Sequence, residues 1–81
     1  MNENLQRLKY HRMIKNAETQ PQYKYAAVDI DGGAWAFLRI PSILTDVDAW
    51  GDGYVVGRLG ELGELGECTW WKDSLMEIKH E

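Results

Sequence analysis

Two carboxylates stand at the end of an apolar run, in the segment VDIDG of residues 28–32. A strand end that delivers Asp29 and Asp31 together could hold a metal ion and a phosphoryl group, as a hydrolase requires. Such an enzyme also needs a parallel sheet, further Lys and Asp motifs and a much longer chain. Asp31-Gly32 equally suits a tight turn. We therefore interpret the pair as part of a hairpin turn, and a minor hydrolase using Asp29 and Asp31 is the last alternative.

A second group of carboxylates, Asp46, Asp48 and Asp52, lies around Gly51. A calcium loop needs oxygen ligands at fixed positions and a bidentate glutamate at the twelfth position. Counted from Asp46, the fifth position is a tryptophan and the twelfth is Gly57. The sequence therefore predicts a solvated acidic turn, with weak cation binding as the alternative.

Nucleophilic catalysis would need a cysteine or serine beside a histidine base. The chain has one cysteine, Cys68, and two histidines, His11 and His80, which lie near its two ends. Cys68 precedes a pair of tryptophans and is interpreted as a small core residue. We therefore predict that the protein is not an enzyme and that it binds no cofactor and no catalytic metal.

The composition is that of one globular domain spanning residues 1–81. Apolar residues make up 44% of the chain and charged residues 27%, and this length gives room for one core. A single cysteine favours a reducing compartment, and the polar N-terminal segment lacks the apolar stretch of a signal peptide. No apolar run is long enough to cross a bilayer, so we expect a cytoplasmic protein without a membrane anchor.

Charge divides the chain into two unlike halves. Residues 1–40 hold six Lys and Arg against four Asp and Glu, whereas residues 41–81 hold three against nine. Affinity for nucleic acid comes largely from Lys and Arg on phosphate, so the acidic half argues against direct nucleic-acid binding. It favours a protein partner with a basic surface.

The first element is predicted as a helix over residues 4–17, because good helix formers fill this stretch without Gly or Pro. An apolar stripe at helical spacing should face the core; its residues are Tyr10, Met13, Ile14 and Ala17. Leu5 and Leu8 fall on the opposite face. They either cap the core at a frayed helix end or belong to a contact with a partner or a second copy.

The rest of the chain predicts an α+β fold. The N-terminal helix packs on a four- to five-stranded antiparallel sheet, with a short helical turn between strands 2 and 3. The strands are expected at residues 23–30, 34–40, 54–59, 68–72 and, as a short strand or a helical turn, 75–79. The helical turn is expected at residues 42–50. Three copies of Leu-Gly-Glu at residues 59–67 fit neither strand nor helix and predict a loop.

Four tryptophans and four tyrosines are many for so small a core. The residues expected to fill that core are Trp35, Phe37, Val55, Val56 and either Trp70 or Trp71. Neighbours in a strand point to opposite faces, so one of the two adjacent tryptophans should be exposed or in an interface. The alternative is that both pack inside, one under the helix and one under the Gly-rich loop.

These features favour a small acidic protein-binding module that uses carboxylates for attraction and aromatic residues for affinity. The predicted partner-binding residues are Asp46, Asp48, Trp50, Asp52, Tyr54, Glu61, Glu64, Glu67, Trp70 and Trp71. In size and charge the chain is similar in type to the small inhibitors that bacteriophages encode against host enzymes or defence complexes. This similarity implies a viral, anti-defence inhibitor.

Self-association is a further expectation. The second strand is apolar on both faces, and Leu5, Leu8 and the surplus tryptophans would gain burial in a homodimer. A small-ligand binder formed at such a homo-oligomer interface is the alternative function.

Overall fold

The computed structural model describes residues 2–63 and 67–80. One long helix is followed by short strands, and a 3-10 turn at Trp71–Asp73 comes after the fifth strand. The elements are α1 (Asn2–Ala17), β1 (Tyr25–Val28), β2 (Gly33–Phe37), β3 (Ser42–Leu44), β4 (Ala49–Gly51), β5 (Val55–Glu61), the 3-10 helix η2 (Trp71–Asp73) and β6 (Met76–Glu77).

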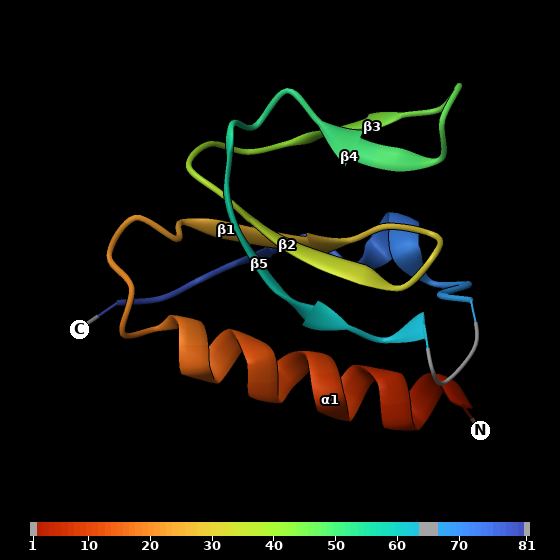
Figure 1. Ribbon diagram of the computed structural model, residues 1–81, viewed down its shortest axis with the longest axis horizontal. Helices are drawn as coiled ribbons and strands as arrows, with labels where there is room; N and C mark the ends of the chain where they lie inside the picture. The colour runs from red at the N-terminus through yellow and green to blue at the C-terminus, as the bar shows by residue number, and fades with distance from the viewer. Residues whose placement is uncertain (1, 64–66, 81) are drawn as a thin grey trace.

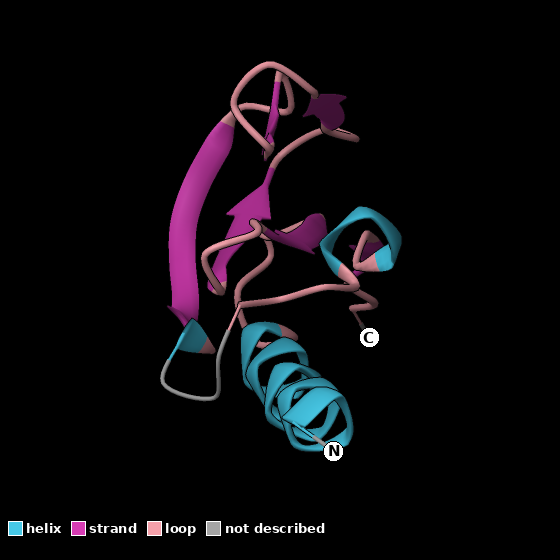
Figure 2. Ribbon diagram, turned by 90° about the vertical axis from the view of Figure 1, so that its right-hand side faces the viewer, coloured by secondary structure: helices cyan, strands magenta, loops and turns pink. Residues whose placement is uncertain are grey.

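The strands form two antiparallel sheets. Four strands lie in the order β5-β2-β1-β6, and β3 pairs with β4 in a separate two-stranded sheet. Helix α1 and the β3–β4 sheet lie at opposite ends of the molecule, with the four-stranded sheet between them (Figures 1 and 2). The predicted α+β class, the N-terminal helix and the four-stranded antiparallel sheet are therefore confirmed. The described helices do not include one that is long and apolar enough to span a membrane.

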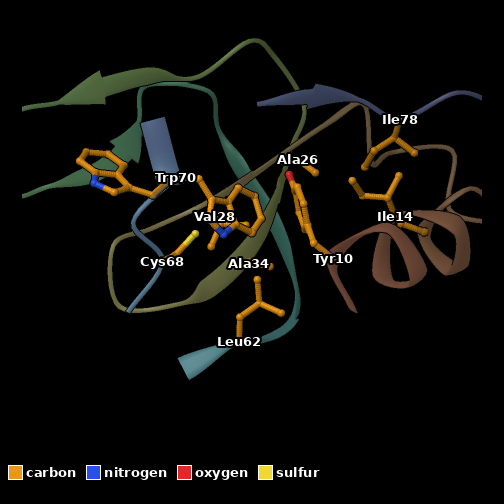
Figure 3. Packing of buried hydrophobic residues seen from close by; sticks show 11 residues of the cluster. Tyr10, Ile14, Ala26, Val28, Ala34, Leu62, Cys68, Trp70 and Ile78 are labelled. Atoms are coloured by element: carbon orange, nitrogen blue, oxygen red, sulfur yellow. The ribbon is translucent and has the colours of Figure 1, made fainter. Parts of the chain in front are cut away.

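Helix α1 packs through the predicted apolar stripe. Tyr10, Ile14 and Ala17 are buried, and Met13 is partly buried against them. Figure 3 shows Tyr10 and Ile14 directed from the helix toward the sheet. A Cβ atom on Gly60 of β5 would stand 2.5 Å from Cε of Met13, so the helix contacts β5 where the strand has no side chain. The first Leu-Gly-Glu copy is thus strand, not loop, because its glycine admits the helix.

The predicted hairpin is formed by β1 and β2. Residues pair antiparallel from Tyr25 with Phe37 to Val28 with Ala34, and β2 is central between β1 and β5. Gly32 takes the left-handed conformation that the turn requires, with φ of 92°.

The segment predicted as a helical turn, residues 42–50, is instead the β3–β4 hairpin. Most residues that follow Ser42 in this segment are β-branched or large and apolar, and such residues favour strands. The reversal is made at residues 45–48, where Asp48 has φ of 51°. The 3-10 turn η2 lies after β5, and not between the second and third strands.

The predicted strand at residues 68–72 is also wrong, because a turn and then η2 occupy this stretch. Trp70 and Trp71 are both buried, with exposed fractions of 5% and 4%. Neighbours in a 3-10 helix do not alternate between two faces, so each ring finds a different part of the core. Trp70 packs near Tyr10 of α1, and Trp71 packs against Trp50 of β4.

The core therefore differs from the predicted one. Phe37 is buried as expected, but Val55 is 51% exposed, and Trp35 and Val56 are only partly buried. Their places are taken by residues that the sequence analysis put in the loop, among them Leu62 (Figure 3). Of the remaining Leu-Gly-Glu residues, 64–66 lie outside the described residues.

The end of the described chain is held against the end of α1. The short strand predicted within residues 75–79 is present as β6, and Ile78 is buried. The ring of His80 then lies between two backbone carbonyls: Nδ1 is 2.9 Å from the oxygen of Glu18, and Nε2 is 2.7 Å from the oxygen of Tyr23.

Candidate partner-binding surface

The ten predicted binding residues do not form one surface. Asp46 and Asp48 lie in the turn between β3 and β4, whereas Asp52 and Tyr54 lie at the opposite end of that sheet, between β4 and β5. Glu61 is at the end of β5, where it pairs with Arg58 at 2.6 Å. The others are Glu67, which is exposed, Glu64, which lies outside the described residues, and Trp50, Trp70 and Trp71, which are partly or fully buried.

Residues 42–54, here called the acidic layer, carry one sign of charge. They contain Asp46, Asp48 and Asp52 and no Lys or Arg. All three aspartates are exposed, and two of them, Asp48 and Asp52, have positive φ angles of 51° and 64°. Aspartate tolerates this conformation better than most residues do, so these positions both turn the chain and present carboxylates to solvent.

Tyr54 is the exception among these turn residues, because a bulky side chain rarely adopts a positive φ. Its φ is 61°, and it is 70% exposed. The left-handed conformation costs a residue with a Cβ on the order of 1–2 kcal/mol. Hydrogen bonds from the residues that follow β2 hold residues 53–54 in place. The backbone N–H of Leu38 donates to the carbonyl of Tyr54, and that of Arg39 donates to the carbonyl of Gly53, both at 2.9 Å.

Four exposed apolar residues lie along the paired segments of residues 37–40 and 53–55. Leu38 is hydrogen-bonded to Tyr54, and Phe37 pairs with Val55 in the sheet register, so the two segments lie side by side. The exposed fractions of the four side chains are 37% for Leu38, 61% for Ile40, 70% for Tyr54 and 51% for Val55. We call these four residues the apolar patch. It adjoins the acidic layer, because Tyr54 belongs to both.

Trp50 connects the acidic layer to the core. Its backbone N–H donates to Oδ1 of Asp29 at 2.9 Å, and its indole N–H donates to the carbonyl of Trp71 at 3.1 Å. The two indole rings meet edge to face, 6.5 Å apart. Trp50 therefore fixes the position of the acidic layer, and the exposed aromatic residue of that layer is Tyr54.

Asp29 and Asp31 both accept hydrogen bonds from backbone N–H groups. Asp29 accepts from Trp50, and Asp31 accepts from Gly33 at 2.9 Å within the hairpin turn. Burial raises the pKa of Asp29, and the bond from Trp50 opposes that rise. Within residues 2–63 and 67–80, no three His, Cys, Asp or Glu side chains gather as a metal site would require. The geometry of the two aspartates is that of turn and loop acceptors.

Cys68 occupies the core. It is fully buried, and desolvation raises the pKa of its thiol to about 11. At neutral pH the residue is a thiol and not the reactive thiolate. Its interpretation as a small core residue is confirmed.

Sequence reasoning missed three members of the apolar patch: Leu38, Ile40 and Val55. The available signal was the apolar character of residues 34–40 on both faces, which was explained by burial of a central strand. Strand β2 ends at Phe37, however, so Leu38 and Ile40 follow the strand and lie in the open. An open groove of about 550 Å³ borders Leu38 on the other side, where Lys24, Lys79 and His80 line it.

Comparison of the chain with protein-family models, curated proteins and solved structures finds no match.

Proposed function

We propose that the protein is a protein-binding module whose acidic layer and apolar patch bind a partner surface that is basic and partly apolar. The observation that carries this proposal is Tyr54, a large aromatic side chain that is 70% exposed on a left-handed backbone beside three other exposed apolar residues. Strained residues of this kind persist where the surrounding structure over-determines them, and they cluster at functional sites.

The two parts of the surface have different roles. Carboxylates that lie in solvent attract a basic partner and raise the rate of association, but each exposed pair adds little affinity. Apolar and aromatic side chains that lose their contact with water supply most of the affinity, and tyrosine is over-represented among such anchors. The acidic layer therefore governs association, and the apolar patch governs dissociation.

A partner of this chemistry is a protein with a basic groove, such as one that binds nucleic acid. Occupation of that groove by an acidic module would block it, and the module would then act as an inhibitor. The proposed class is accordingly a viral-type inhibitor of a host enzyme or defence complex, and the surface charge of residues 42–54 supports a protein partner over direct contact with nucleic acid.

The test begins with capture of a partner from a lysate of the native host and identification by mass spectrometry. Kinetics are then measured with a triple variant in which Asp46, Asp48 and Asp52 are changed to asparagine. We expect association to slow by about tenfold at low ionic strength and to lose most of its salt dependence, with little change in dissociation.

The matched control changes three exposed carboxylates outside the acidic layer, Glu18, Asp73 and Glu77, to amides. Its net charge equals that of the triple variant, so it isolates the position of the charges from their number. Equal slowing in both variants, or unchanged association in the triple variant, would contradict the proposal.

A further inference from the structure

The outward side of α1 carries a stripe of exposed leucines and cations. Leu5, Leu8, Arg12 and Lys15 recur at helical spacing on the side opposite Tyr10 and Ile14, which face the core. Leu5 and Leu8 are 55% and 50% exposed, and Arg12 and Lys15 are also exposed. We call these four residues the outer stripe. The outer stripe is both apolar and basic, and these are the two properties that the proposed function requires of a partner surface.

The charges at the two ends of the molecule are matched in size. Helix α1 holds four Lys and Arg and one Glu, a formal charge of +3. The acidic layer holds three Asp and no base, a formal charge of −3. The four-stranded sheet separates the two regions, which lie at the bottom and at the top of the molecule in both views (Figures 1 and 2). One molecule therefore cannot bring its own outer stripe onto its own acidic layer.

We infer that a second copy of this chain is a partner of the acidic layer, and that the outer stripe of one copy docks on the acidic layer and apolar patch of the next. This inference rests on the proposed function of that surface. Arg12 and Lys15 would face the aspartates, and Leu5 and Leu8 would cover Tyr54 and Ile40. The same contact would bury apolar residues that are exposed on both molecules. A domain of 81 residues has too small a core to bury all of these residues itself.

The contact is head to tail. A two-fold pairing of α1 with α1, or of acidic layer with acidic layer, would bring like charges together and is disfavoured. A head-to-tail contact joins two different surfaces, so each added copy presents both surfaces again. The assembly is consequently a chain or a closed ring, in contrast to the homodimer expected from the sequence.

Two variants test this geometry by complementation. The stripe variant carries Leu8→Gln and Arg12→Gln, and the layer variant carries Ile40→Lys and Asp52→Asn, so the substitutions introduce no opposite charges that would attract the two altered surfaces to each other. Each variant keeps one intact surface. Sedimentation equilibrium at low ionic strength, at concentrations up to about 100 μM, measures the mass. The wild type should exceed the mass of a dimer as concentration rises, and each variant alone should remain at 9.3 kDa.

An equimolar mixture of the two variants should form one-to-one pairs and stop there, because only one productive contact remains between them. A mixture that stays monomeric while the wild type associates would overturn the inference, and so would a wild type that is monomeric throughout. All four substituted residues are exposed, and circular dichroism verifies that both variants fold. A second pair, with Leu5→Gln and Lys15→Gln as the stripe variant, guards against a local defect in α1.

Failure of this inference is distinguishable from failure of the proposed function. If only the self-contact is wrong, the layer variant still loses the partner captured from lysate while the stripe variant retains it. If the proposed function is wrong, the layer variant captures that partner as well as the wild type does.

Discussion

Replacing Trp71 by alanine is expected to remove about 3–5 kcal/mol of stability, the usual cost of deleting a large buried aromatic side chain. Trp71 is 4% exposed and packs edge to face against Trp50. At about 0.05–0.15 kcal/mol per residue, a chain of 81 residues has a total stability of about 4–12 kcal/mol. The substitution therefore removes at least about a quarter of that stability, and at the lower end of the range it unfolds much of the population.

Urea denaturation followed by circular dichroism measures this loss. Trp35→Ala is the control, since Trp35 is the same residue type but is only partly buried, and it should lose much less. A Trp71→Ala protein as stable as the wild type would contradict the packing. From the sequence, Trp71 was expected to bind a partner, but its burial makes stability the property that its replacement changes.

Replacing Tyr54 by glycine is expected to separate stability from binding. Relief of the left-handed conformation stabilises the folded state by about 1–2 kcal/mol. The greater chain entropy of glycine in the unfolded state destabilises the folded state by about 0.5–1 kcal/mol. Tyr54 is 70% exposed, so little packing is lost. The variant should be as stable as the wild type or up to about 1 kcal/mol more stable. Its affinity for the captured partner should nevertheless fall by about 2 kcal/mol, roughly thirtyfold, mainly through faster dissociation.

Tyr54→Ala is the matched variant. It removes the same side chain but keeps a Cβ on the left-handed backbone. It should therefore bind the partner as weakly as Tyr54→Gly does and be less stable than Tyr54→Gly. Surface plasmon resonance and urea denaturation measure the two properties. If Tyr54→Gly binds as well as the wild type, the apolar patch is not the anchor; if it is much less stable, the backbone strain is not relieved by glycine.

The elements that the sequence predicted well are those in which local preference and burial agree. Helix α1 combines good helix formers with one apolar stripe, and that stripe is buried. The β1–β2 hairpin has two apolar runs and a glycine at the position of positive φ. In such segments a short stretch of sequence determines both the conformation and the side that faces the core.

The two wrong elements depend on contacts with distant residues. The β3–β4 hairpin is fixed to the core when Trp50 bonds to Asp29 and Trp71, which are both 21 positions away in sequence. In the turn before η2, the indole N–H of Trp70 donates to Gln6, 64 positions away. Gln6 is 1% exposed, and no periodicity argument places a polar residue there. Pairwise contacts at such separations leave no pattern in a local window.

The candidate surface was predictable in its charge but not in its shape. Counting residues was enough to find an acidic stretch without a base, because charged side chains are exposed almost wherever they occur. The apolar patch needed the three-dimensional pairing of Leu38 with Tyr54, and only exposure separates it from the core.

The ring of His80 fastens the end of the described chain to two places at once. Its Nδ1 lies 2.9 Å from the carbonyl oxygen of Glu18, which follows α1, and its Nε2 lies 2.7 Å from the carbonyl oxygen of Tyr23, which precedes β1. One side chain therefore spans the connection between α1 and β1.

The C-terminal segment consequently acts as a clasp on the α1–β1 connection, so removing the ring of His80 should loosen both that connection and the end of the described chain. In urea denaturation, His80→Gln should lose about 1 kcal/mol of stability. Exposed His11→Gln should change stability much less, because surface substitutions usually have small effects. Equal losses in the two variants would mean that the ring of His80 does not hold the segment.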